Sequence, residues 1–164
     1  MIQRAQSVYL GLAFICVVLL IPFALFAIDV TVDVYSFHAE LGAHGLVGEG
    51  LANKTIPVYG LYIGLALLTF LTLMSYKNRK RQLFLCRINL LLHLTTLAGV
   101  YAFYYLGGDM LLQTLSYPKS TPPKIVFSML PGFYLIVSTI PLLLLAIRGI
   151  KNDEKLVKSL DRLR

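Results

Sequence analysis

Cysteine is scarce in this sequence, and the placement of the two cysteines excludes several classes of protein. Cys16 and Cys86 lie far apart in a chain of 164 residues, each within an apolar segment. No Cys-x-x-Cys motif occurs, which argues against a disulfide framework, a zinc ribbon and a thiol oxidoreductase pair. We expect both cysteines to be buried and to act as small hydrophobic residues.

Charged residues are also few, which argues against a soluble protein. Asp, Glu, Lys and Arg make up 14% of the chain, against about 25% in soluble proteins. Apolar residues reach 57%, against a usual share of about 45–50%. In a soluble protein the net charge of +7 would suggest nucleic-acid binding. The placement of the basic residues accounts for this charge without nucleic acid, so we expect no nucleic-acid partner.

Four apolar segments are each long enough for a membrane-spanning helix, which needs about 20 residues. They cover residues 8–28, 56–76, 83–106 and 125–147, and none contains Asp or Glu. Helices are expected because lipid cannot satisfy the hydrogen bonds of a bare backbone. The sequence therefore predicts an all-α integral membrane protein, an up-down four-transmembrane-helix bundle that forms a single membrane domain over residues 1–164.

The distribution of Lys and Arg predicts the orientation, because cytoplasmic loops are enriched in both. With the amino terminus inside, the inner segments are the terminus, the hairpin 77–82 and the tail 148–164, and they hold most of the basic residues. The outer loops 29–55 and 107–124 hold Lys54, Lys119 and Lys124. This asymmetry predicts that both termini lie in the cytoplasm and that basic side chains face anionic lipid headgroups.

The first outer loop and the tail each carry a secondary-structure pattern. Residues 29–35 alternate apolar and polar side chains, as a half-buried strand does, so we expect a small β-like outer loop. In the tail, Asn152 or Asp153 can cap a helix with an apolar stripe, which predicts a cytoplasmic amphipathic C-terminal helix. This helix either lies on the inner leaflet or docks on a protein partner. The residues expected to bind lipid or a partner are Lys77, Arg79, Lys80, Arg81, Arg87, Lys155, Leu156, Lys158, Leu160, Arg162, Leu163 and Arg164.

The third apolar segment carries a polar stripe. Cys86, Asn89, His93 and Thr96 recur at three and four residues and therefore share one helix face. Polar groups at membrane depth usually face other helices, so we expect a hydrogen bond from His93 to Ser138 or Thr139 on the fourth segment. The expected interhelical polar contacts thus involve Asn89, His93, Ser138 and Thr139. The alternative is that His93 belongs to a ligand or proton site.

Residue sets that carry known membrane chemistry are missing from the sequence. A haem held by two histidines needs a second intramembrane histidine beside His93, whereas His38 and His44 fall in the outer loop, where we expect them to be solvated. A small proton-coupled exporter needs a carboxylate within a span. An intramembrane serine protease needs a base and oxyanion donors around Ser138, which no Gly-x-Ser-Gly motif surrounds. We therefore expect no enzyme activity, no catalytic residue, no metal and no cofactor, with His93 as the candidate if a cofactor is held.

Three stretches carry a resemblance to a known family. They are the opening residues 1–10, the central residues 77–89 and the closing residues 153–164. Together they resemble a family of small four-span membrane proteins from Bacteroidota, known as domain of unknown function 4293. The resemblance implies a bacterial inner-membrane protein with this topology and implies no reaction. Because the three stretches fall on the expected cytoplasmic side, we expect the partner surface there.

These observations together favour a non-enzymatic accessory or assembly subunit of a multi-subunit bacterial inner-membrane complex, such as translocation, respiratory or envelope machinery. The expected partners are membrane lipids and other integral membrane subunits. Two alternatives use the polar face of the third segment. One is a carrier for a small molecule or lipid, and the other is a redox subunit that holds a quinone or haem near His93.

Overall fold

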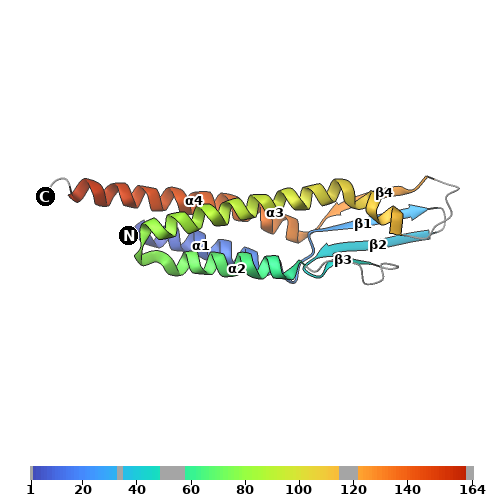
Figure 1. Cartoon of the computed structure of the whole chain (residues 1–164), viewed down its shortest axis with the longest axis horizontal. Helices are drawn as coiled ribbons and strands as arrows, with labels where there is room; N and C mark the ends of the chain where they lie inside the picture. The colour runs from blue at the N-terminus through green and yellow to red at the C-terminus, as the bar shows by residue number, and fades with distance from the viewer. Residues whose placement is uncertain (1, 33–34, 49–57, 115–121, 162–164) are drawn as a thin grey trace.

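The computed structural model describes residues 2–32, 35–48, 58–114 and 122–161, and it separates the chain into a helical part and a sheet. Both ends of the chain lie at the end of the helical part that is remote from the sheet (Figure 1). The elements, in order, are α1 (Ile2–Leu19), β1 (Phe26–Val32), β2 (Tyr35–Gly42), β3 (Gly45–Gly48), α2 (Tyr59–Met74), the 3-10 helix η1 (Ser75–Lys77), α3 (Arg79–Thr114), β4 (Lys124–Met129) and α4 (Pro131–Asp161).

The prediction of an all-α, up-down four-transmembrane-helix bundle is wrong. Four strands form an antiparallel sheet in the order β3-β2-β1-β4. In the described part of the chain, three helical segments are long and apolar enough to cross a membrane, namely Tyr59–Lys77, Arg79–Leu106 and Pro131–Lys155. The apolar part of α1, Gln6–Leu19, is shorter than these.

Two of the predicted spans include residues that form strands. β1 begins at Phe26, within the predicted span 8–28, and β4 fills the start of the predicted span 125–147. Both strands are rich in Ile, Val and Phe, which raise hydropathy and also favour strands. Helix α4 begins at Pro131, one residue after β4, because proline fits the first turn of a helix and disfavours helical backbone at the residue before it.

The sheet has one apolar face and one polar face, because successive side chains of a strand point to opposite sides. The register pairs Phe26 with Leu41 and Ile28 with Ala39 on the apolar side, and Asp29 with His38 on the polar side. The apolar face is buried at Phe26, Ile28, Val30, Val32, Ala39 and Leu41. The polar face, defined by Asp29, Thr31, Ser36, His38 and Glu40, is exposed or half-buried.

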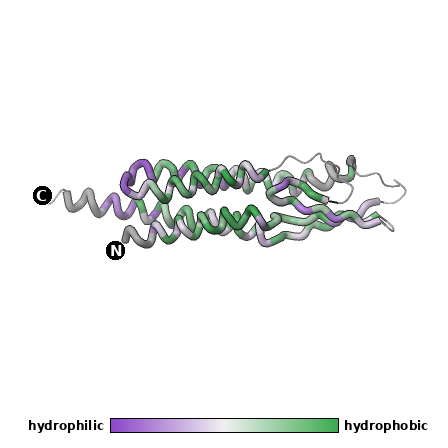
Figure 2. Tube along the Cα trace, turned by 90° about the horizontal axis from the view of Figure 1, so that it is seen from below, coloured by the Kyte–Doolittle hydropathy of each residue, from purple (hydrophilic) through white to green (hydrophobic). Residues whose placement is uncertain are grey.

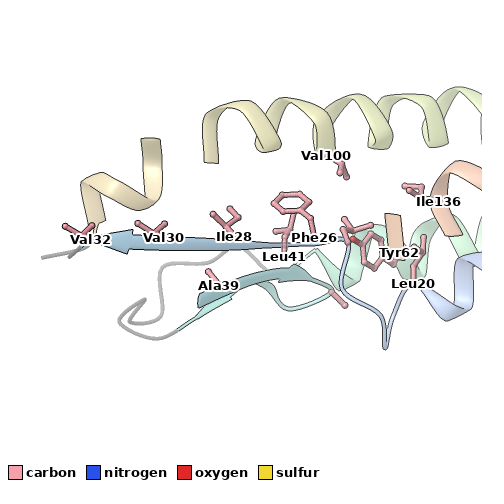
Figure 3. Close-up of a cluster of buried hydrophobic side chains, with 12 residues drawn as sticks. Leu20, Phe26, Ile28, Val30, Val32, Ala39, Leu41, Tyr62, Val100 and Ile136 are labelled. Carbon is pink, nitrogen blue, oxygen red and sulfur yellow. The ribbon is translucent and has the colours of Figure 1, made fainter. Parts of the chain in front are cut away.

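Helix α3 covers the apolar face of the sheet (Figure 3). Its 36 residues span about 54 Å at about 1.5 Å per residue, longer than the ~30 Å hydrocarbon core of a bilayer. The Phe26 ring lies 6.0 Å from the Phe103 ring and 6.3 Å from the Tyr104 ring, and Tyr104 lies 4.5 Å from Phe127 of β4. The C-terminal half of α3 and the sheet therefore share one hydrophobic core.

A second apolar cluster lies among the helices. It contains Leu10 and Ala13 of α1, Cys86 of α3, and Leu143, Ala146, Ile147 and Ile150 of α4. Helix α1 packs against α2 and α4, and α3 packs against the same two helices. Cys86 is buried, while Cys16 is half-buried. The most hydrophilic helical segments lie at the end away from the sheet (Figure 2).

Candidate functional site

The polar stripe of α3 lies inside the helical part of the molecule. Asn89 and His93 are completely buried, as is Cys86, and Thr96 is 9% exposed. Leu90 packs on the cluster around Cys86, whereas Leu97 packs on the cluster that includes the sheet. Asn89 and His93 therefore occupy a polar layer between the two apolar clusters.

The hydrogen bonds in this layer define the orientation of each side chain. His93 Nδ1 lies 2.8 Å from the backbone oxygen of Asn89, which can only accept, so Nδ1 carries the proton and donates. The Asn89 amide Nδ2 donates to Thr69 Oγ1 of α2 at 2.8 Å. The Thr69 hydroxyl in turn donates to the backbone oxygen of Leu65 at 2.7 Å. The layer thus links α3 to α2.

The expected hydrogen bond from His93 to Ser138 or Thr139 is not formed. The Ser138 hydroxyl donates to the Leu135 oxygen at 2.8 Å, with Cys16 Sγ 3.8 Å away, and the Thr139 hydroxyl donates to the Ile136 oxygen at 2.6 Å. Hydroxyls in helices often bond to a carbonyl one turn earlier, which satisfies them without a neighbouring helix. The interhelical hydrogen bond of the stripe instead joins Asn89 to Thr69, one of two buried threonines in α2.

Two acceptors of the layer have no hydrogen-bond partner within the described residues. They are His93 Nε2 and Asn89 Oδ1, and both atoms are buried. An unsatisfied buried polar group costs about 1–3 kcal/mol, so such groups usually have a partner. Within the described residues, no group of three His, Cys, Asp or Glu side chains is placed to hold a metal ion. The layer therefore presents two buried hydrogen-bond acceptors and, among the described residues, no set of side chains arranged to bind a metal ion.

The described residues among those predicted to bind lipid or a partner lie at the end away from the sheet, which we call the basic end. Lys77, Lys80, Arg81, Arg87 and Lys155 are exposed there. Arg79 differs, because its Nη1 donates to the backbone oxygen of Asp153 at 3.0 Å and it is half-buried. Leu156, Lys158 and Leu160 lie in the last turns of α4, and Arg162, Leu163 and Arg164 lie outside the described residues.

The tail does not form a separate helix capped by Asn152 or Asp153, because α4 continues without a break through Asp161. Asp153 is instead 5% exposed and accepts a hydrogen bond from the Gln6 amide of α1. With the bond from Arg79 of α3, this contact joins three helices at the basic end. The α3 start is capped by Asn78, whose Oδ1 accepts from the Arg81 backbone N–H at 3.2 Å.

A charged cluster on the polar face of the sheet was not predicted from the sequence. His38 Nδ1 lies 2.6 Å from Asp29 Oδ1, and His38 Nε2 lies 3.3 Å from Glu40 Oε1. These hydrogen bonds, that to Asp29 first, raise the pKa of His38 above its ordinary value of 6.5. The sequence signal was the alternation of Asp29, His38 and Glu40 with apolar residues, which becomes visible once β1 and β2 are paired.

The His38 cluster makes a pH-dependent contribution to stability. Because the folded-state pKa is raised, the stabilisation is complete below pH 6.5 and is lost as pH rises through the higher pKa of the folded protein. The side chains are about half exposed, so we expect a change in the free energy of unfolding of roughly 0.2–1 kcal/mol. Denaturant titrations between about pH 5 and pH 8 measure it.

The variant His38→Gln should lose this part of the pH dependence. His44→Gln is the matched control, because His44 is also exposed but lies in the turn between β2 and β3. If the wild type and His38→Gln show the same slope of unfolding free energy against pH, the cluster does not contribute.

Three helical segments that are long and apolar enough to cross a bilayer indicate a membrane protein, and the sheet shares an apolar core with these helices. The chain belongs to the family described as Domain of unknown function (DUF4293), whose sequence profile matches residues 2–163. The resemblance seen in the sequence is therefore confirmed, whereas four spans are not. None of the curated proteins compared with the chain matches it.

Proposed function

We propose that this protein is a non-enzymatic accessory or assembly subunit of a multi-subunit complex in the bacterial inner membrane, and that it contacts a partner protein through the polar face of its sheet. The feature that carries the proposal is the rigid attachment of this sheet to the helices. The basic end serves a second contact, with anionic lipid headgroups.

The attachment of the sheet involves both its core and its backbone. Its apolar face is fixed on α3 by the Phe26 contacts, and a single residue, Leu130, separates β4 from α4. The Leu130 N–H donates to the Leu25 oxygen at 3.0 Å, and the Leu25 N–H donates to the Leu41 oxygen of β2 at 2.7 Å. A platform held in this way presents its other face in a fixed orientation, which lowers the entropic cost of binding a partner.

The polar face has the chemistry of a contact surface. The side chains of Asp29, His38 and Glu40 are 45%, 54% and 50% exposed, so a partner can contact their charged groups. Electrostatic complementarity of such groups favours specific association and its rate. Val47, which pairs with Glu40, adds an apolar side chain that is 58% exposed on the same face.

The charges at the two ends support the proposed orientation. Exposed Lys and Arg side chains gather at the basic end, whereas the polar face of the sheet carries Asp29 and Glu40. Since cytoplasmic segments are enriched in Lys and Arg, we place the basic end and both termini in the cytoplasm and the sheet on the outer side. We therefore propose that the partner binds the sheet and not the cytoplasmic side that we expected from the sequence alone.

Photo-cross-linking in living cells tests the proposal. A photoreactive amino acid replaces Ser36 or Val47 on the polar face, and Leu91, a 63% exposed residue within the span of α3, serves as the matched control. We expect the two sheet positions to give cross-links to the same one or few membrane proteins, identified by mass spectrometry, and Leu91 to give mainly lipid adducts.

The outcomes separate the parts of the proposal. Protein cross-links from Lys80 at the basic end, with none from Ser36 or Val47, would move the contact back to the cytoplasmic side. If all four positions give only lipid or self adducts, the protein is not a subunit of a larger complex.

A further inference from the structure

Three buried side-chain acceptors have no hydrogen-bond partner among the described residues: Asp153 Oδ1, on a carboxylate that already accepts from Gln6, and one atom each of His93 and Asn89. His93 and Asn89 are four apart on α3, so their side chains lie one turn apart on the same face of the helix. Both are 0% exposed. The unsatisfied atoms are Nε2 of the His93 ring and Oδ1 of the Asn89 amide.

The remaining polar groups of the layer cannot supply the donors. The Asn89 amide hydrogen-bonds to Thr69, and the Thr69 hydroxyl already donates to Leu65. Thr96 donates to the Leu92 oxygen at 2.8 Å, and Thr139 donates to the Ile136 oxygen at 2.6 Å. Each of these hydroxyls has one proton, and each proton is used within its own helix. No hydroxyl proton of these residues is therefore left for His93 Nε2 or Asn89 Oδ1.

The orientation of the His93 ring is fixed by its other nitrogen. Since Nδ1 donates to the Asn89 backbone oxygen at 2.8 Å, the neutral ring has an unprotonated Nε2 with a lone pair. The Asn89 amide is oriented by the same logic, because its Nδ2 is directed at Thr69 and its Oδ1 is thereby left as an acceptor. Two oriented acceptors one turn apart are complementary to a ligand that donates hydrogen bonds.

The surroundings restrict the class of ligand. No Asp or Glu occurs between residues 59 and 106 or between 131 and 152, so the helices around the layer have no carboxylate to balance a cation. A buried charge without a counter-charge is strongly unfavourable, which excludes an ammonium group or a metal ion. Complete burial of both side chains further favours a small ligand over a large planar cofactor such as a haem.

We propose that His93 and Asn89 form a binding site for a small neutral hydroxyl donor, which donates to Nε2 of His93 and to Oδ1 of Asn89. Two sources share this chemistry. One is an internal water molecule, which has two O–H groups and commonly satisfies buried polar groups. The other is the hydroxyl group of a membrane-soluble organic molecule. The site is independent of the partner contact proposed for the sheet.

Nitrogen-15 NMR of the full chain in lipid bilayers, with labelled histidine, tests the site. The exposed His38 and His44 are identified through His38→Gln and His44→Gln, which leaves the His93 signals assigned without changing the buried layer. We expect His93 to be neutral with its proton on Nδ1, and its Nε2 resonance to be displaced from that of a free imine nitrogen in the direction caused by an accepted hydrogen bond.

The two sources are distinguished in the same sample. Transfer of magnetisation from water protons to Nε2 identifies water as the ligand. A displacement that persists without such transfer, and that disappears when the protein is purified through detergent and returned to synthetic lipid, identifies an organic hydroxyl. An Nε2 resonance at the position of a free imine nitrogen, a proton on Nε2, or a charged imidazolium ring would each overturn the proposal.

Discussion

Replacing Phe26 with alanine is expected to lower the free energy of unfolding by about 3–5 kcal/mol, the usual cost of removing a buried phenylalanine side chain. Phe26 is 1% exposed, and its ring contacts those of Phe103 and Tyr104 on α3 and of Phe127 on β4. The truncation would leave a cavity where β1, β4 and α3 meet. We expect the sheet to detach from α3 before the spanning helices separate, because Phe26 joins the two parts.

Unfolding of the purified protein in mixed micelles with increasing SDS measures the loss, with circular dichroism as the signal. Phe23→Ala is the matched control, because Phe23 lies three residues away and is 42% exposed. The same aromatic ring is removed there without a closed cavity, so little change is expected. Equal losses in both variants would show that the sheet and α3 are not held together by the Phe26 cluster.

The helices α2 and α3 could be predicted from the sequence, because hydropathy and helical periodicity are local patterns. The span predicted over 56–76 contains α2 (Tyr59–Met74), and α3 contains the span predicted over 83–106. The stripe of Cys86, Asn89, His93 and Thr96 also followed from helical spacing, and all four residues are buried. Helical periodicity and the absence of charge are enough to predict such helices, because in lipid the backbone hydrogen bonds must form within the segment itself.

The complete sheet could not be predicted from the sequence, because the pairing of its edge strand β4 is non-local. β1 pairs with β4, almost a hundred residues later, with Ile28 opposite Phe127. Both strands sit at the edges of long apolar segments, so their hydrophobic residues resembled membrane spans. The alternation noticed over 29–35 marked the end of β1 without revealing its start. An apolar face covered by α3 and an apolar face covered by lipid have the same composition, and hydropathy cannot separate them.

The sequence also did not show which neighbouring helix supplies the hydrogen-bond partner of the polar stripe. Helical period places Asn89 and His93 on one face of α3 but does not say which neighbouring helix that face meets. A similar depth favours Ser138 and Thr139, whereas the structure shows Asn89 donating to Thr69 of α2. The choice depends on how the helices are arranged around α3, and this arrangement is set by contacts between segments far apart in the chain.

Replacing Gly132 with alanine is expected to destabilise the protein by about 1–3 kcal/mol or more, the range for inserting atoms into a closely packed site. A Cβ atom at Gly132 would lie 2.5 Å from the Ala24 oxygen and 2.8 Å from the Phe23 oxygen. Both atoms are backbone, so neither can move aside as a flexible side chain would. The Gly132 N–H also donates to the Ala24 oxygen at 3.0 Å, and this bond fixes the start of α4 against the segment between α1 and β1.

Gly99→Ala in α3 is the matched control, because a Cβ atom there would meet nothing within 4 Å. Alanine at an unobstructed helical position is favoured over glycine by about 0.5–1 kcal/mol, so this variant should be more stable than the wild type. The two substitutions add the same methyl group but should shift the SDS unfolding midpoint in opposite directions. A shift in the same direction for both would mean that the close approach at Gly132 does not hold the sheet end of α4 in place. In that case the orientation of the sheet on the helices would have to depend on the Phe26 cluster alone.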